Sequence, residues 1–294
     1  MKREVKIMYL AIDIGGTYTK YGYYQSNGIC LQKNMIPTVK TNKKTFYHTL
    51  KTLITKEVEG IAVSMPGLID SQRGYIHAIT LLPYFNETDF CQEFSSLTHL
   101  PVTLQNDAKC AALGEMWKGS LKNVDNGFMI VLGTGIGGTY ILHEKIVESK
   151  HYKIGELGSF LIPTSNGYSN FGKEYNAVKL IHDLSDILKC PDDGQIVFQQ
   201  LTSSHQAMQY FEHYCLQIAT MIYNLDYLLD LDIVTIGGGI SQQPFLIQTI
   251  QKQFHDLRKQ YKEDEHEPVI KACQFQNEAN LLGALYHFHT KKGG

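Results

Sequence analysis

The segment Ile130–Thr139, IVLGTGIGGT, constrains the fold of this chain more than any other stretch. Its apolar start predicts a buried strand, which leads into a loop dense in glycine. Glycine tolerates positive φ and lets an anion approach the backbone N–H groups, so such a turn suits phosphate binding. Gly133, Gly135 and Gly138 also have the spacing of a dinucleotide-binding fingerprint, so a dehydrogenase is open at this point.

The composition is that of a globular protein that binds a small molecule. With 294 residues and 43% hydrophobic content, the chain is long enough for two domains that each bury a core. Lys and Arg total 27 against 29 Asp and Glu, a formal net charge of −2, and no long run of like charge occurs. Such a balance offers no broad attraction to nucleic acid or membrane, so we expect a small neutral or anionic partner.

The sequence predicts a cytoplasmic location and reduced thiols. The apolar run near the N-terminus is short and ends at Asp13 without a small-residue cleavage site, which favours a first strand over a signal peptide. No apolar run approaches the roughly 18 residues that a membrane span needs. The six cysteines are scattered without a CxxC pair, which argues against disulfides and against a structural zinc site.

A second glycine turn follows the predicted first strand, Val5–Ile12. Asp13 stands at the end of this strand. The turn itself consists of Gly15, Gly16 and Thr17. The β-branched and aromatic residues up to Tyr24 predict a returning strand, hence a hairpin, which could also be a plain turn without a ligand. Because Ile130–Thr139 has the same design, we expect two related halves, each holding part of a polyphosphate.

The residues after the central glycine loop weigh against a dehydrogenase. In the dinucleotide-binding motif, the third glycine opens a helix. Here Thr139–Leu142 is strand-like, so the chain is expected to turn back as a hairpin. An NAD-dependent dehydrogenase stays as an alternative that predicts NAD binding.

Two junctions in the first half place polar or rigid groups at predicted strand ends. Pro66 and Gly67 form a turn after an apolar strand, and such turns present backbone groups to ligands or simply reverse the chain. Asn106 and Asp107 lie where a strand meets a helix, and one of them could be only an N-cap. The other interpretation is that Asp107 is a general base within reach of a substrate hydroxyl.

Two glycine-rich segments in the second half could likewise be either structural turns or ligand sites. The motif Gly155–Gly158 holds Glu156 between glycines and is either a surface turn or a site for a carboxylate. Gly237–Gly239 follows the apolar strand Ile233–Ile236 and permits close approach of a planar or phosphate-bearing group, or a structural tight turn.

The remaining segments predict helices and loops from the spacing of their apolar residues. We expect helices at Thr45–Val58, Glu174–Leu188, Ser203–Leu231 and Glu278–His289, and loops at Leu81–Phe94 and Tyr168–Gly172. The apolar stripe of the longest helix is expected in a core. The aromatic loop Leu81–Phe94 could wall a pocket or lie on the surface.

Taken together and in this order, the motifs resemble the ROK family of sugar kinases and repressors. They are DIGGT at 13–17, PG at 66–67, ND at 106–107, GTGIGGT at 133–139, GELG at 155–158 and IGGGI at 236–240. The resemblance covers essentially the whole chain. It implies an α/β fold of two actin-like ATPase (ribonuclease H-like) domains with a ligand cleft between them, and usually a homodimer. The implied domains are 1–106, completed by a C-terminal helix at 278–294, and 107–277.

The resemblance also implies roles for single residues. Asp107 matches the family's catalytic base. The residues that match sugar ligands are Pro66, Gly67, Asn106, Asp107, Glu156 and, at a different spacing, Glu174. The residues that match the ATP site are Asp13, Gly15, Gly16, Thr17, Thr134, Gly135, Gly238 and Gly239. Asp13 matches the carboxylate near Mg²⁺, through water.

One region departs from the family's pattern. Ser159 stands where the family usually has a histidine, and Thr164–Lys173 replaces a cysteine-rich zinc segment, so no zinc is expected. The family's repressors carry a DNA-binding helix-turn-helix before the first glycine turn, and the position of Asp13 leaves us expecting none. The zinc-less pattern and the run NEANLLGALYHF at 277–288 most resemble the family's β-glucoside kinases.

The resemblance therefore predicts an ATP- and Mg²⁺-dependent sugar kinase. The expected acceptor is a primary (6-) hydroxyl of a hexose unit, with a β-glucoside such as cellobiose preferred. Glucose, fructose and N-acetylmannosamine are alternative acceptors. A sugar-sensing regulator without turnover is an alternative of another class, against which the intact Asp107 and the two phosphate turns argue.

Overall fold

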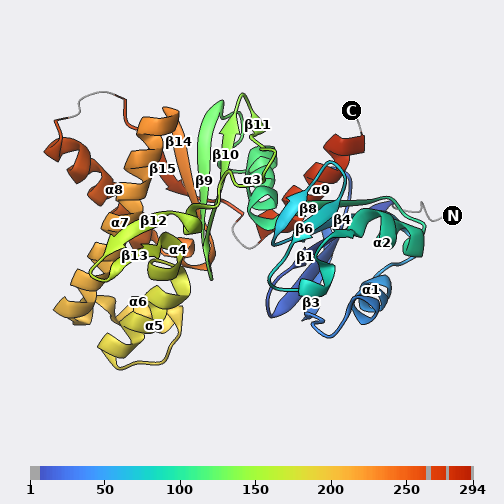
Figure 1. Cartoon of the computed structure of the whole chain (residues 1–294), viewed down its shortest axis with the longest axis horizontal. Coiled ribbons are helices and arrows are strands. Elements are labelled where there is room, and N and C mark those ends of the chain that lie inside the picture. The colour runs from blue at the N-terminus through green and yellow to red at the C-terminus, as the bar shows by residue number, and fades with distance from the viewer. Residues whose placement is uncertain (1–6, 263–265, 276–277, 293–294) are drawn as a thin grey trace. The chain divides into compact units, whose positions relative to one another are not determined.

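The computed structural model describes residues 7–262, 266–275 and 278–292, which form two compact α/β units (Figure 1). The first unit runs to Gly119 and includes Lys150–Tyr152 and the chain from Glu278 on. The second comprises Ser120–Ser149 and the chain from Lys153 to Asn277. The predicted α/β class is confirmed. The division lies after Gly119 rather than after residue 106, because the helix α3 (Asp107–Lys118) packs within the first unit.

The first unit is built on a five-stranded sheet in the order β3-β2-β1-β4-β8. The strands are β1 (Met8–Ile14), β2 (Tyr18–Tyr24), β3 (Cys30–Pro37), β4 (Val58–Met65) and β8 (Val102–Asn106). β1, β2 and β3 pair antiparallel, whereas β4 runs parallel to β1 and β8 parallel to β4. The carboxyl ends of β1, β4 and β8 therefore meet at one edge of the sheet.

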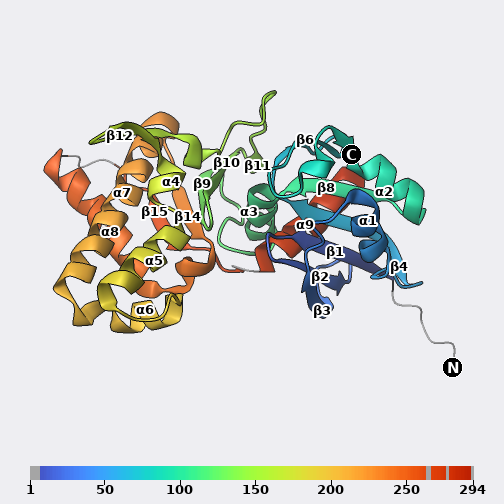
Figure 2. The same ribbon diagram turned by 60° about the horizontal axis from the view of Figure 1, so that its bottom comes forward.

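Helices cover both faces of this sheet. α1 (Lys43–Lys51) and α2 (Phe90–Thr98) contribute to a core with alternate residues of β1 and β4. On the other face, α3 and α9 (Ala279–Lys292) lie side by side, as Figures 1 and 2 show, and Cys110 and Phe288 pack on Ala62. The residues from Glu278 on thus complete the first unit.

Two glycines let α3 and α9 approach until their backbones touch. A Cβ on Gly283 would lie 1.6 Å from the carbonyl oxygen of Cys110, and one on Gly114 would lie 2.4 Å from that of Ala279. Any larger residue would push the helices apart. This contact holds α3, and with it Asp107 at its first position, firmly against α9.

The segment Leu81–Phe94, expected as a pocket wall or surface loop, instead helps to fill the core of the first unit. Phe85, Phe90 and Phe94 are fully buried. A 3₁₀ turn at Pro83–Phe85 precedes α2, whose N-cap Asp89 accepts a hydrogen bond from the Gln92 amide at 3.1 Å. The segment also contains β7 (Thr88–Asp89), which forms a small sheet with the preceding strands β5 (Leu68–Asp70) and β6 (Tyr75–Ala78).

The second unit has its own five-stranded sheet, in the order β11-β10-β9-β14-β15. The strands are β9 (Asn126–Leu132), β10 (Ile136–Leu142), β11 (Lys145–Ile146), β14 (Ile233–Gly237) and β15 (Val269–Ala272). β9 and β10 form an antiparallel hairpin, and β14 runs parallel to β9. The centre of the first sheet, β2-β1-β4, has the same arrangement, which bears out the expectation of two related halves.

The second unit carries helices on one face of its sheet. They are α4 (Phe171–Glu174), α5 (Ala177–Leu188), α6 (Gly194–Gln200), α7 (His205–Leu229) and α8 (Pro244–Gln260). Figure 2 shows α7 beside α8 and α5, and its apolar stripe is buried as predicted. Among the described residues, no helix is long and apolar enough to cross a membrane.

Two segments of the second unit differ from expectation. The predicted helix Glu174–Leu188 is divided, because α4 ends at Glu174 and Asn176 caps a new helix, α5. The predicted loop Tyr168–Gly172 contains β13 (Gly167–Asn170), which pairs antiparallel with β12 (Leu161–Thr164).

Candidate active site

Asp13 carries a buried carboxylate near the end of β1, and the residue is 7% exposed. Its Oδ1 accepts hydrogen bonds from Ser64 Oγ at 2.8 Å and from Asn280 Nδ2 at 3.0 Å. Burial raises the pKa of Asp13, and the two hydrogen bonds oppose this effect. Three elements, β1, β4 and α9, thus fix one carboxylate in place. The sequence alone did not point to Ser64 or Asn280 as its partners.

The turn Gly15–Thr17 joins β1 to β2 as a hairpin, as predicted. The Gly15 amide donates to the Tyr18 carbonyl at 3.1 Å, which closes the turn. Thr38, just after β3, stabilises the turn with two hydrogen bonds. Its hydroxyl donates to the Gly15 carbonyl at 2.7 Å, and its amide donates to the Thr17 carbonyl at 3.0 Å. Gly16 and Thr17 remain exposed at the tip.

The junction of β8 and α3 holds Asn106 and Asp107. Asn106 is the N-cap of α3, with Oδ1 accepting from the Lys109 amide at 3.2 Å, so the capping interpretation is correct for this residue. Its Nδ2 also donates to the Gly67 carbonyl at 3.1 Å. Asp107 is half-buried at the first position of α3, where Oδ1 accepts from the Ala108 amide at 2.8 Å.

Strand pairing and one hydrogen bond bring together four predicted site residues of the first unit, namely Asp13, Pro66, Gly67 and Asn106. Across the parallel strands, Asp13 pairs with Ser64, and Met65 pairs with Asn106. Asn106 then reaches the Pro66-Gly67 turn through its side chain.

The loop Gly133–Gly135 joins β9 to β10. The Gly133 amide donates to the Gly135 carbonyl at 3.0 Å, and Thr134 and Gly135 are exposed. No atom lies within 4 Å of a Cβ built on Gly135, so the space beside its backbone is open. Since a strand rather than a helix follows, the dinucleotide-binding interpretation is wrong.

The turn after β14 lies directly beside this loop. Gly238 has φ +96°, and a Cβ there would lie 2.0 Å from the Leu132 carbonyl oxygen at the end of β9. Only glycine fits such a contact. Ser241 Oγ donates to the Gly238 carbonyl at 2.8 Å and stabilises the turn. A Cβ on Gly239 would meet no atom within 4 Å, so this position also has open space beside it.

The motif Gly155–Gly158 is packed on β10. A Cβ on Gly155 would lie 1.9 Å from the Gly138 carbonyl oxygen, and one on Gly158 would lie 2.9 Å from that of Ile136. The glycines therefore have a packing role, and they fix the exposed Glu156 between them near the start of β10.

Glu174 lies close to the same motif. Its Oε1 accepts from Ser169 Oγ at 2.6 Å. A Cβ on Gly172, two residues earlier, would lie 2.8 Å from Gly158 Cα, so the segments that carry Glu174 and Glu156 are in contact.

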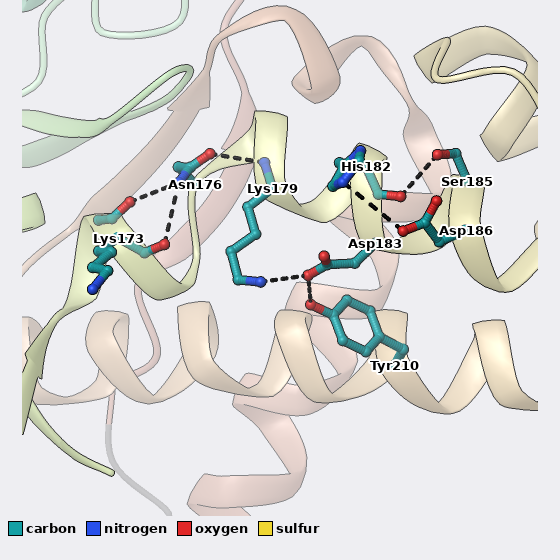
Figure 3. A network of polar contacts seen from close by, with 9 residues as sticks. Lys173, Asn176, Lys179, His182, Asp183, Ser185, Asp186 and Tyr210 are labelled. Atoms are coloured by element: carbon teal, nitrogen blue, oxygen red, sulfur yellow. Dashed lines mark hydrogen bonds and ion pairs between the residues drawn. The ribbon is translucent and has the colours of Figure 1, made fainter. Parts of the chain in front are cut away.

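Asn176 connects these segments to the glycine loop. As Figure 3 shows, its side chain caps α5, with Oδ1 accepting from the Lys179 amide at 2.8 Å. Its Nδ2 donates to the Gly172 carbonyl at 2.9 Å. The next residue, Ala177, donates its amide to the Gly133 carbonyl at 2.9 Å. The predicted residues of the second unit are thus gathered around the β9-β10 hairpin.

A magnesium ion fits the donor set at Asp13. The described part of the chain contains no group of three or more His, Cys, Asp or Glu able to hold a metal. Mg²⁺ bound with nucleotides takes one or two carboxylates and otherwise water and phosphate oxygens. Ser64 and Asn280 both donate to Oδ1 of Asp13, so neither of these hydrogen bonds uses Oδ2.

Two α/β units, each with a glycine hairpin at the end of a central strand, are typical of the actin-like ATPase class. Within that class, the ROK family model matches residues 9–291, and the chain belongs to this family.

Known relatives agree with this assignment. A β-glucoside kinase from Listeria monocytogenes is 27% identical over 290 residues, which cover 95% of this chain and 96% of that enzyme. A ROK family protein from Streptococcus pneumoniae, solved in complex with sucrose, has a TM-score of 0.88 at 29% identity, covering 98% and 99% of the two chains. A ROK family glucokinase from Streptomyces griseus, solved with glucose and AMPPNP, shares the fold with a TM-score of 0.79 at 19% identity, covering 98% and 100%. The predicted family, fold and ATP-dependent sugar-kinase class are confirmed.

Proposed function

We propose that the chain transfers the γ-phosphate of ATP to the primary hydroxyl of the glucose unit of a β-glucoside. The observation that carries the proposal is the junction at the start of α3, where Asp107 follows an asparagine that is bonded to the Gly67 turn. The name of the Listeria relative supports a β-glucoside, and the sucrose bound by the Streptococcus protein supports an acceptor with two sugar rings.

On the donor side, the two hairpin turns would hold the phosphates. Gly16 and Thr17 of the first turn and Thr134 and Gly135 of the second are exposed at strand ends. Gly238 and Gly239 would lie on the nucleotide side. Mg²⁺, held through water by Asp13, would neutralise charge on the phosphates. Hydrogen bonds to these turns, such as the one from Thr38 to the Gly15 carbonyl, would keep the backbone in place during phosphoryl transfer.

On the acceptor side, Asp107 would accept the proton of the attacking hydroxyl. Asn106, the Pro66-Gly67 turn, Glu156 and Glu174 would orient the other hydroxyls of the sugar. Phosphoryl transfer requires little covalent chemistry from the protein itself. Catalysis would therefore come mainly from this positioning of the sugar and from charge neutralisation. The residues with these proposed roles come from both units. A homodimer and a cytoplasmic location stay predictions of the sequence.

An ADP-release assay over a panel of sugars tests the proposed acceptor. The panel is cellobiose, glucose, fructose and N-acetylmannosamine, each with ATP and Mg²⁺. We expect kcat/KM for cellobiose to exceed that for every monosaccharide by about 10-fold or more, because about 1.4 kcal/mol of extra transition-state binding gives that factor. A higher kcat/KM for a monosaccharide would refute the β-glucoside. No sugar-dependent ADP release at all would instead favour a sugar-sensing protein without turnover.

A further inference from the structure

A row of aromatic side chains runs along the outer face of β6. Tyr75 and His77 alternate with Ile76, which is fully buried in the core, so they point away from it. The centroids of their rings are 5.0 Å apart. The row continues at both ends: the Arg73 guanidinium lies 5.2 Å over the Tyr75 ring, and the Tyr152 ring lies 5.2 Å from His77 at an interplanar angle of 31°.

The His77 end of this row lies beside the Pro66-Gly67 turn, which is predicted to bind sugar. Ala78, the residue after His77, pairs with Leu68 across β5 and β6. A Cβ on Gly67 would lie 2.6 Å from the Ala78 carbonyl oxygen, so the turn and the end of β6 are in direct contact. Gly67 in turn accepts the hydrogen bond from Asn106. A short chain of contacts therefore leads from the start of α3 to the His77 ring.

The two ends of the row differ in how they are held. A hydrogen bond fixes the Tyr75 side chain, because its hydroxyl donates to Glu87 Oε2 at 3.0 Å. Tyr152 is not part of any helix or strand, and its φ of +55° is one that bulky residues rarely adopt. It belongs to the short segment Lys150–Tyr152, which is part of the first unit while its flanking residues belong to the second. Such backbone conformations persist where the surroundings impose them, and they gather at ligand sites.

We propose that His77 and Tyr152 form a platform for the second ring of the β-glucoside, beyond the sugar that is phosphorylated. The inference rests on the proposed function. In a β-glucopyranose the hydroxyls lie around the rim and both faces present C–H groups, which pack on aromatic rings, while ring nitrogens and a phenol can bond rim hydroxyls. Both side chains are half-buried, which leaves part of each ring accessible. The ligand class is a glucosyl unit or a flat aromatic aglycone in β-linkage.

The test compares two acceptors in variants of the full chain. His77→Ala and Tyr152→Ala are assayed for ADP release with cellobiose and with glucose. We expect the ratio of kcat/KM for cellobiose to that for glucose to fall about 10-fold in each, mainly through a higher KM for cellobiose. Tyr152→Phe retains the ring and should keep the ratio within about 3-fold of the wild type.

Tyr227→Ala is the matched control, because it removes an exposed tyrosine whose ring lies 5.1 Å from that of Tyr223 in the second unit. Its ratio should equal that of the wild type. Thermal unfolding shows which variants fold, and Tyr152→Leu, which keeps the bulk without the ring, replaces the alanine variant if that one does not.

Two results would overturn the platform. One is an unchanged ratio in folded His77 and Tyr152 variants. The other is an equal loss with both sugars, since this would place the rings at the phosphorylated sugar itself. If the wild type phosphorylates neither sugar, the proposed function fails. Calorimetric titration of cellobiose and glucose into the wild type and the variants then tests the platform separately, by comparing the dissociation constants of the two sugars.

Discussion

Gly135 is the residue at which a structural role and a binding role can be separated most cleanly. A Cβ at this position meets no atom within 4 Å, and its φ is not positive. Gly135→Ala should therefore change the free energy of unfolding by less than about 1 kcal/mol. It should raise KM for ATP about 10-fold or more, because the methyl group would occupy the space through which a phosphate approaches the backbone.

Gly194→Ala is the matched control for this prediction. Gly194 begins α6, and a Cβ there would make only ordinary contacts, the nearest with Ile181 at 3.7 Å. The control should leave KM for ATP unchanged. An unchanged KM in Gly135→Ala as well would remove the β9-β10 loop from the phosphate site.

The residues of the candidate site could be predicted where a motif is local, and not where it is assembled at long range. Asp13, Asn106 and Asp107 stand at strand ends that the sequence marks with glycines, prolines and apolar runs. The hydrogen bond from Asn280 to Asp13 joins residues 267 positions apart, and nothing in the spacing of the chain predicts it. Thr38 was missed for the same reason, since its role depends on the pairing of β2 with β3.

At the scale of elements, a polar contact joins α5 to α7 in the second unit (Figure 3). Asp183 Oδ2 accepts from Lys179 Nζ at 2.8 Å on its own helix and from the Tyr210 hydroxyl of α7. Partial burial by itself raises the pKa of Asp183, but the hydrogen bonds from Lys179 and Tyr210 outweigh it and hold the pKa below its ordinary value.

A lowered pKa makes the contact pH-dependent. A carboxyl group whose pKa is lower in the folded chain stabilises the fold above its unfolded pKa, and this stabilisation is lost as pH falls through the folded pKa. Asp183→Asn should therefore lower the free energy of unfolding at pH 7 by about 1–2 kcal/mol. Urea denaturation should show the difference from wild type shrinking as the pH falls below about 4.

Asp186→Asn on the same helix is the control, because its side chain is 74% exposed and its carboxylate lies 3.8 Å from the His182 ring. This variant should differ from wild type by less than about 0.5 kcal/mol. Identical pH profiles for the two variants would contradict the role given to Asp183.

Among the elements, those with strong patterns were predictable. The two glycine hairpins, the buried stripe of α7 and the strand before Gly237–Gly239 follow from periodicity and turn residues. α2 was missed because its short run is rich in phenylalanine, whose spacing does not distinguish a helix from a buried loop. The break between α4 and α5 depends on a single capping residue, Asn176, within an otherwise helical pattern.

At the scale of the whole molecule, the order of the motifs predicted the class of fold, while the division of the chain required the structure. The close contact of α3 and α9 at Gly114 and Gly283 places the helix after Asn106 in the first unit. In the proposed mechanism, the general base lies in the first unit and two glutamates that orient the sugar lie in the second. The proposed mechanism therefore assigns roles to residues of both units.

The most direct test of the account is sugar-dependent ADP release by the full chain with Asp107→Asn. With cellobiose, ATP and Mg²⁺, we expect kcat to fall by about 100-fold or more, as is typical when a general base is lost. Calorimetric dissociation constants for cellobiose and ATP should stay within about 3-fold of the wild type, since the amide keeps the shape of the side chain. Near-normal turnover in this variant would contradict the assignment of Asp107 as the base.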